Sequence, residues 1–194
     1  MLKKLIIVII LSIFCFGFTI QDMHKRVIAI KNTSVSCSTA NDSQQWVPTS
    51  QCDSFGTTNT WSATEFTIAS QITVTGYLID LRDNSGGDTG STRVVVVDDS
   101  GGEPDETSEI SGSAIQVACT SIPNSYEQYF FELASPLVLP SGTYWVIIQE
   151  IDSAVLNTHY CSTSTGDARA YSDNGTTWTV SSGQSLDVEI WGCN

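Results

Sequence analysis

The densest group of potential metal ligands in the chain lies in a glycine-rich turn over residues 98–106. Five of these nine positions carry carboxylates, and Gly101 and Gly102 stand among them. Hard oxygen ligands on a flexible turn suit Ca²⁺, although the spacing differs from that of an EF-hand. The candidate calcium ligands are Asp98, Asp99, Glu103 and Asp105. The alternative interpretation is a solvent-exposed acidic turn without a metal.

Aromatic side chains near polar loops form a second candidate site. Exposed rings beside hydrogen-bonding side chains can serve as stacking platforms for sugars. The candidate ligand-binding residues are Tyr160, Tyr171, Asp173 and Trp178. Aromatic residues on strands also pack against their neighbours, which is the alternative interpretation.

Residues 171–178 match most of the Asp-box pattern S-x-D-x-G-x-T-W, with tyrosine in place of the serine. In such a hairpin we expect Asp173 to cap the turn and the Asn-Gly pair to supply positive φ. The tryptophan then packs the turn against the sheet. A single copy predicts a hairpin rather than a catalytic propeller.

Histidine usage argues against a Ser–His–Asp hydrolase. His24 and His159 are the two histidines, and the chain contains no G-x-S-x-G sequence. The many acidic residues leave a two-carboxylate glycosidase as the remaining enzyme class. We therefore expect a protein that is not an enzyme, and we assign no catalytic residue.

The N-terminus has the pattern of an export signal. Lys3 and Lys4 precede an apolar run over residues 5–20. This run is shorter than the roughly 20 residues that a membrane-spanning helix needs. Residues 1–19 are therefore predicted to be a signal peptide cut after Thr19, or an uncleaved anchor helix. The predicted location is extracellular or at the cell surface, with membrane contact only through an uncleaved segment.

Charge excludes several classes of partner. After residue 31, three basic side chains stand against twenty acidic ones, which gives a net charge of −17. Such a surface repels phosphate backbones and anionic lipid headgroups, so nucleic acid is not an expected partner. The expected partners are a glycan or an extracellular protein.

Cysteine usage agrees with export. Five cysteines follow the predicted signal, and none has the spacing of a zinc site. Disulfides are the usual state of cysteines outside the cytoplasm. Cys37 and Cys52 close a short loop and are predicted to pair. The sequence leaves the pairing of Cys119, Cys161 and Cys193 open.

The remainder of the chain has the period-2 pattern of β-strands. Short runs of alternating apolar and polar residues are separated by turn residues, which is typical of antiparallel sheets. Residues 94–97 are apolar on both faces and predict an interior strand. A change of phase at Gly76 predicts a β-bulge. We expect an all-β, antiparallel two-sheet β-sandwich over residues 61–194, after a polar extension over residues 20–60.

The same alternation predicts which side chains are buried. The expected core positions are Val94, Val96, Tyr129, Phe131, Val146, Ile148, Val188 and Ile190. The expected exposed positions are Gln128, Glu132, Asp187 and Glu189.

Two motifs resemble a known family. They are the turn D-x-G-G-x-P at residues 99–104 and the segment L-P-S-G-T-Y-W-V at residues 139–146. With the strands around them, over residues 61–192, they are similar to the extracellular jelly-roll domains of bacterial surface proteins called choice-of-anchor domains. The resemblance implies a jelly-roll-like sandwich and no catalytic residues. A C-terminal anchoring segment is not seen, so attachment is expected to be N-terminal or absent.

Two classes of function follow. The first is a secreted or surface-displayed recognition module that binds a glycan or a protein partner through its loops. The second is a structural subunit of an extracellular assembly. In that case the β-prone residues 27–31 would add a strand to a neighbouring sheet.

Overall fold

The computed structural model describes residues 39–43, 52–54, 61–83, 90–125, 127–151, 156–161, 168–182 and 185–193. For residues 39–43, 52–54, 156–161 and 185 only the backbone is described. All of these residues belong to one compact unit, Thr39–Asn194. The predicted signal peptide or anchor helix lies outside the described residues.

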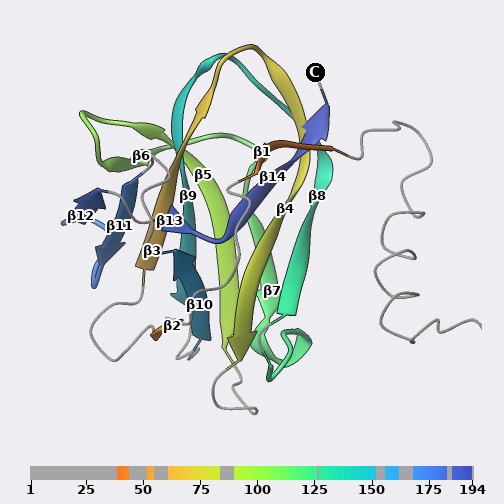
Figure 1. Ribbon diagram of the computed structural model, residues 1–194, viewed down its shortest axis with the longest axis vertical. Coiled ribbons are helices and arrows are strands. Elements are labelled where there is room, and N and C mark those ends of the chain that lie inside the picture. Colours follow the sequence, from red (N-terminus) through yellow and green to blue (C-terminus); the bar gives the residue numbers. More distant parts are fainter. Residues whose placement is uncertain are drawn as a thin grey trace, which may run out of the picture. The chain divides into compact units, whose positions relative to one another are not determined.

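The described residues form two antiparallel sheets of seven strands each (Figure 1). The first sheet has the order β1-β14-β4-β10-β13, with β8 on the opposite side of β4 and β2 on β10. Its strands are β1 (Thr39–Ser43), β2 (Cys52–Ser54), β4 (Ile72–Asp83), β8 (Glu127–Leu139), β10 (Leu156–Cys161), β13 (Ser185–Leu186) and β14 (Val188–Cys193). Two of these strands, β1 and β2, come from the segment that the sequence predicts to be an extension.

The second sheet has the order β12-β11-β3-β9-β5-β6, with β7 also paired to β5. Its strands are β3 (Trp61–Ile68), β5 (Ser91–Asp99), β6 (Pro104–Glu109), β7 (Ile115–Ala118), β9 (Gly142–Ile151), β11 (Ala168–Ser172) and β12 (Thr179–Ser182). The one helix in the described part of the chain is a single 3₁₀ turn, Cys119–Ser121. The all-β, antiparallel prediction is therefore confirmed. Among the described residues, no helix is long and apolar enough to cross a membrane.

Alternate side chains from both sheets fill the space between them and form the main core. Of the expected core positions, Val94, Val96, Phe131, Val146, Ile148, Val188 and Ile190 are buried, and Tyr129 is half-buried against them. Strand β5 lies between β9 on one side and β6 with β7 on the other, so it is the interior strand that its apolar run predicts. The two sheets thus pack in a sandwich-like arrangement.

The register of β4 against β8 shifts between Val74 and Gly76, which confirms the bulge expected at this glycine. A Cβ on Gly76 would lie 2.5 Å from the carbonyl oxygen of Phe131 and 2.6 Å from the ring of Phe130. Both neighbours belong to β8. Only a residue without a side chain allows this approach of backbone and ring.

The prediction that Asp187 is exposed is wrong, because the side chain keeps only 8% of its surface. The alternation of faces is as expected, since Leu186 and Val188 on either side lie in the core. Asp187 occupies the bend between β13 and β14, where the strand partner changes from β10 to β4. The outward side of this bend is itself covered. Burial, then the charges of Asp80 and Glu189, raises the pKa of Asp187 to about 7.

The other three positions expected to be exposed divide differently. Gln128 and Glu132 are exposed, as predicted. Glu189 is half-buried and accepts a hydrogen bond from the Trp191 indole N–H at 3.0 Å. Trp191 in turn contacts Phe130 edge to face, at 6.1 Å between ring centroids. Aromatic side chains therefore cover part of the outer face of the first sheet.

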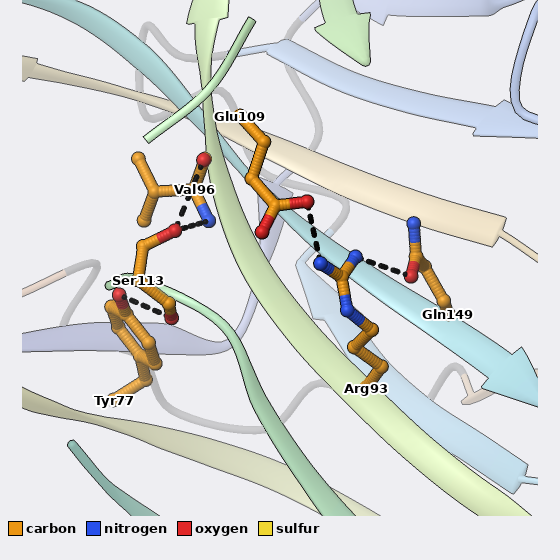
Figure 2. Close-up of polar contacts among 6 residues, drawn as sticks. All are labelled: Tyr77, Arg93, Val96, Glu109, Ser113 and Gln149. Atoms are coloured by element: carbon orange, nitrogen blue, oxygen red, sulfur yellow. Dashed lines mark hydrogen bonds and ion pairs between the residues drawn. The ribbon is translucent and has the colours of Figure 1, made fainter. Parts of the chain in front are cut away.

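A serine side chain fills a gap in the hydrogen bonding of β5. On one side, β5 pairs with β7 up to Val94 and with β6 from Val97 onward. Between them, the Ser113 hydroxyl accepts a hydrogen bond from the N–H of Val96 and donates one to its carbonyl. The Tyr77 hydroxyl, from the first sheet, donates to the Ser113 carbonyl (Figure 2). One residue therefore connects both sheets.

The cysteines are described only in part. Cys37 lies outside the described residues and only the backbone of Cys52 is described, so their disulfide stays a prediction. Cys119 is buried, with its Sγ 3.8 Å from the Thr92 hydroxyl oxygen. Cys193 is disulfide-bonded, and no disulfide joins it to Cys119.

Candidate binding pocket

The outer face of the second sheet carries a second apolar cluster, separate from the main core. It follows from the double-sided apolar run of β5, which sends Val94 and Val96 inward and Val95 and Val97 outward. The buried members of this cluster are Ala63, Val95, Val97, Trp145, Ile147, Ala170 and Trp178. Trp61 is half-buried at its margin. An apolar outer face needs a cover, and the hairpins at both edges of the sheet supply it.

A pocket of about 440 Å³ opens over this cluster. Its apolar lining consists of Trp61, Val95, Val97 and Ile147, and its polar lining consists of Arg93, Glu106, Thr107, Glu109, Gln149 and Asn174. The residues come from β3, β5, β6, β9 and the turn after β11. The volume lies within the range of about 300–1,000 Å³ that is typical of small-molecule sites.

Strand register explains how the lining is assembled. Gln149 of β9 lies opposite Trp61 on one side and Arg93 on the other, so these three side chains form one row across the sheet. In the next row that faces outward, Ile147 lies opposite Val95. The row of Gln149 and Arg93, with Trp61 at one end, therefore borders an apolar floor that contains Ile147 and Val95.

Arg93 is held in place by two partners (Figure 2). One guanidinium nitrogen donates to the Gln149 side-chain oxygen at 2.9 Å, and another donates to the Glu109 carboxylate. The two side chains of the ion pair keep 23% and 39% of their surface, so the pair lies at the rim of the pocket. A fixed guanidinium loses little conformational freedom when a ligand binds.

The turn after β11 forms the opposite wall. Ser172 Oγ accepts the N–H of Gly175 at 2.9 Å, and Asn174 Oδ1 accepts the N–H groups of Thr176 and Thr177 at 2.9 and 3.0 Å. Gly175 has φ +74°. The hairpin expected here is therefore present, but Ser172 and Asn174 make these capping bonds where Asp173 was expected to cap.

Gly175 brings this turn down onto the pocket. A Cβ on it would lie 2.6 Å from Glu106 Oε2 and 2.6 Å from Trp61 Cζ3. Both atoms therefore lie within twice that distance, 5.2 Å, of each other. Figure 1 shows β6, which carries Glu106, projecting on the same side of the molecule as β11 and β12. The approach of the two hairpins sets the width of the pocket at this end.

The carboxylates of β6 have different surroundings. Partial burial, followed by the charge of Asp105, raises the pKa of Glu106 above its usual value. Hydrogen bonds from the Thr107 side chain and N–H lower the pKa of Asp105. Glu109 is bound to Arg93. Glu106 is thus the carboxylate of the pocket without a cation partner among the described residues.

The four residues predicted to bind a ligand are not brought together as one exposed platform. Only the backbone of Tyr160 is described, in β10. Tyr171 is half-buried, with the Arg169 guanidinium 5.5 Å from its ring centre, and burial lowers the pKa of this arginine to about 10. Asp173 is exposed on the turn, and Trp178 keeps 9% of its surface. Their binding roles stay predictions.

Trp61 is the aromatic side chain that sequence reasoning did not select. It packs edge to face against Trp178, with 6.3 Å between ring centroids, and lines the pocket. Its place at the start of a strand gave no signal of this role. The role depends on Gly175 and Glu106, which are far away along the chain.

Two of the four predicted calcium ligands, Asp99 and Asp105, accept hydrogen bonds from N–H groups. Asp99 accepts the N–H of Gly102 at 3.2 Å and the Trp145 indole N–H at 2.8 Å. Asp105 accepts the N–H of Thr107 at 3.0 Å. Asp98 and Glu103 are exposed. No group of three or more His, Cys, Asp or Glu side chains within the described residues is arranged to hold a metal ion. The convergence of oxygens that calcium requires is therefore not found there.

Comparison with known proteins gives no family for the chain. No protein-family model matches it, and no curated protein matches its sequence.

Proposed function

We propose that the protein is a secreted or surface-displayed, non-catalytic recognition module that binds a glycan in the pocket on the second sheet. The observation that carries this proposal is a tryptophan at the end of a row of hydrogen-bonding side chains, beside an apolar floor. Sugars present an apolar face of C–H groups and a rim of hydroxyls, which such a surface complements.

The roles within the pocket follow from its geometry. Trp61 supplies the stacking surface. Gln149 and Arg93 supply donors and acceptors that are already fixed by their mutual hydrogen bond. Asn174 supplies its amide from the opposite wall. Because these groups are held before the ligand arrives, less conformational entropy is lost on binding.

The location and family remain part of the proposal. The N-terminal pattern supports export, and the acidic composition supports a soluble partner rather than nucleic acid. The resemblance to choice-of-anchor jelly-roll domains rests on the sequences of residues 99–104 and 139–146, and one contact joins these two segments. The Trp145 indole N–H donates to Asp99, which joins residues 139–146 to residues 99–104.

A glycan array tests the proposal, with the exported form of the protein as probe. We expect binding to a restricted set of glycans, equal with calcium and with chelator. Trp61→Ala should weaken the binding at least about tenfold, or about 1.4 kcal/mol. Trp191→Ala is the matched control, since it removes a half-buried tryptophan from the outer face of the first sheet. Equal losses in both variants, or no glycan bound, would overturn the proposal.

Because two carboxylates lie in the pocket, the glycan-binding experiment can also test for hydrolysis. Glu106 and Glu109 both line it, as a two-carboxylate glycosidase would require. Incubation of each bound glycan with the protein, followed by product analysis, distinguishes binding from hydrolysis. Intact glycan is expected, and release of a shorter sugar in molar excess over the protein would show hydrolysis and overturn the non-catalytic proposal.

A second candidate function, a subunit that assembles by strand addition, is favoured by one observation. Strand β8 is thirteen residues long and pairs only with β4 among the described strands. A long edge of this kind can accept a further strand. The proposed donor, residues 27–31, lies outside the described residues. Size-exclusion chromatography tests this function, since deletion of residues 27–31 should abolish any oligomer.

A further inference from the structure

The charged side chains that line the pocket carry a net negative charge. Arg93 contributes one positive charge, while Glu106 and Glu109 contribute two negative charges. Glu109 and Arg93 neutralise each other through their ion pair. The remaining negative charge belongs to Glu106, which forms no ion pair with a described residue.

Glu106 is also placed beside an aromatic ring. Its Oε2 and the Cζ3 of Trp61 lie no more than 5.2 Å apart, because each is 2.6 Å from the Cβ position of Gly175. The carboxylate is half-buried and therefore partly shielded from water. A carboxylate attracts a cation through its charge, and an indole ring can add attraction through its negative face.

The Glu106 carboxylate beside Trp61 should interact differently with neutral, basic and acidic groups of a sugar. A hydroxyl or an acetamido group offers only a neutral donor to Glu106. A protonated amine offers a charge-assisted hydrogen bond, which is about twice as strong as a neutral one. An acidic sugar would place two negative groups together and be repelled. The net charge of −17 over residues 32–194 further raises the local concentration of cations near the pocket.

We propose that the pocket prefers a glycan with a free, protonated amine, an amino sugar, and that Glu106 is the residue that selects it. This inference rests on the proposed glycan-binding function. It adds the class of ligand and a residue that determines specificity.

Three trimers that differ at one position test the preference. They are β-1,4-linked glucosamine, its fully N-acetylated counterpart and cellotriose, which carry an ammonium, an acetamido and a hydroxyl group at C2. Isothermal titration of the exported protein at pH 6 and low salt should show the glucosamine trimer binding at least tenfold tighter than the other two. The preference should shrink at high salt, because the Debye length falls from about 10 Å at 0.1 M to about 3 Å at 1 M.

Two variants assign the preference to Glu106. Glu106→Gln should remove the tenfold difference in affinity between the amine trimer and the two neutral trimers. Glu103→Gln is the matched control, because Glu103 is an exposed carboxylate of the same hairpin outside the pocket lining. It should leave the preference intact.

The outcomes separate this inference from the function on which it rests. Equal affinity for the three trimers, equal effects of the two variants, or no binding of any trimer would overturn the preference for an amine. The glycan-binding function would still stand if other glycans on the array bind in a manner that depends on Trp61. If no glycan on the array binds, both fail.

Discussion

Replacement of Asp187 by asparagine removes a negative charge that the fold makes costly. Burial, with the neighbouring charges of Asp80 and Glu189, raises the pKa of Asp187 from 3.8 to about 7. Between these values the folded protein holds a proton that the unfolded chain has released. Stability from this group is therefore complete below about pH 4 and is lost as the pH rises to about 7.

The size of the effect can be worked from the shift. Of the rise in the pKa of Asp187, about two units lie between pH 5 and pH 7. Each pKa unit corresponds to about 1.4 kcal/mol in the free energy of unfolding. The penalty therefore grows by at most about 3 kcal/mol between pH 5 and pH 8. If residual contact with water screens half of it, about 1.5 kcal/mol remains, which shifts Tm by about 3–6 °C in a chain of this size.

Thermal denaturation of Asp187→Asn and the unmodified protein at pH 5 and pH 8 measures this difference. We expect the variant to gain about 3–6 °C on the unmodified protein as the pH rises from 5 to 8. Glu132→Gln is the control, since it removes an exposed carboxylate from β8 in the same sheet. A Tm difference for Asp187→Asn that is the same at both pH values would refute the reasoning.

Three further substitutions test individual contacts by urea denaturation. Ser113→Ala leaves the buried N–H of Val96 without its acceptor and should cost about 1–3 kcal/mol, whereas a change below about 0.5 kcal/mol would contradict this role. Asp99→Ala removes the acceptor of the Trp145 indole N–H and should cost about 1–2 kcal/mol; unchanged stability would show that the bond contributes nothing net. Gly76→Ala drives a methyl group to 2.5 Å from a backbone oxygen of β8 and should cost about 3 kcal/mol or more, so a stable variant would argue against this strand register.

Local patterns were sufficient to predict the main-core strands, but not β1 and β2, which lie in the predicted extension. The apolar run through residues 94–97 and the alternation through residues 186–190 are properties of neighbouring residues, and the core positions follow from them directly. The bulge at Gly76 was also visible, because a change of phase and a glycine coincide there. Both signals lie within a few residues of the feature that they predict.

The candidate site depended on contacts that no local pattern carries. Trp61 becomes a pocket wall only because Gly175 and Glu106 meet it from two distant hairpins. Asp187 follows the alternation, yet it lies at a bend where its strand changes partner, and its side chain is buried there. The acidic turn was chosen for its composition, but Asp99 and Asp105 use their oxygens to cap N–H groups of the turn. Composition alone does not show which acceptors are already occupied.

Strand β5 divides its side chains between the main core and the pocket within a single stretch of chain. Val94 and Val96 belong to the main core, while Arg93, Val95 and Val97 line the pocket. Substitutions at the even-numbered positions would disturb the main core, whereas substitutions at Val95 or Val97 would disturb the second apolar cluster that forms the pocket floor. A library confined to residues 93 and 149, which are polar residues of the pocket lining, would explore new ligands while both apolar clusters are kept. The same division would let natural variation retune the ligand one substitution at a time.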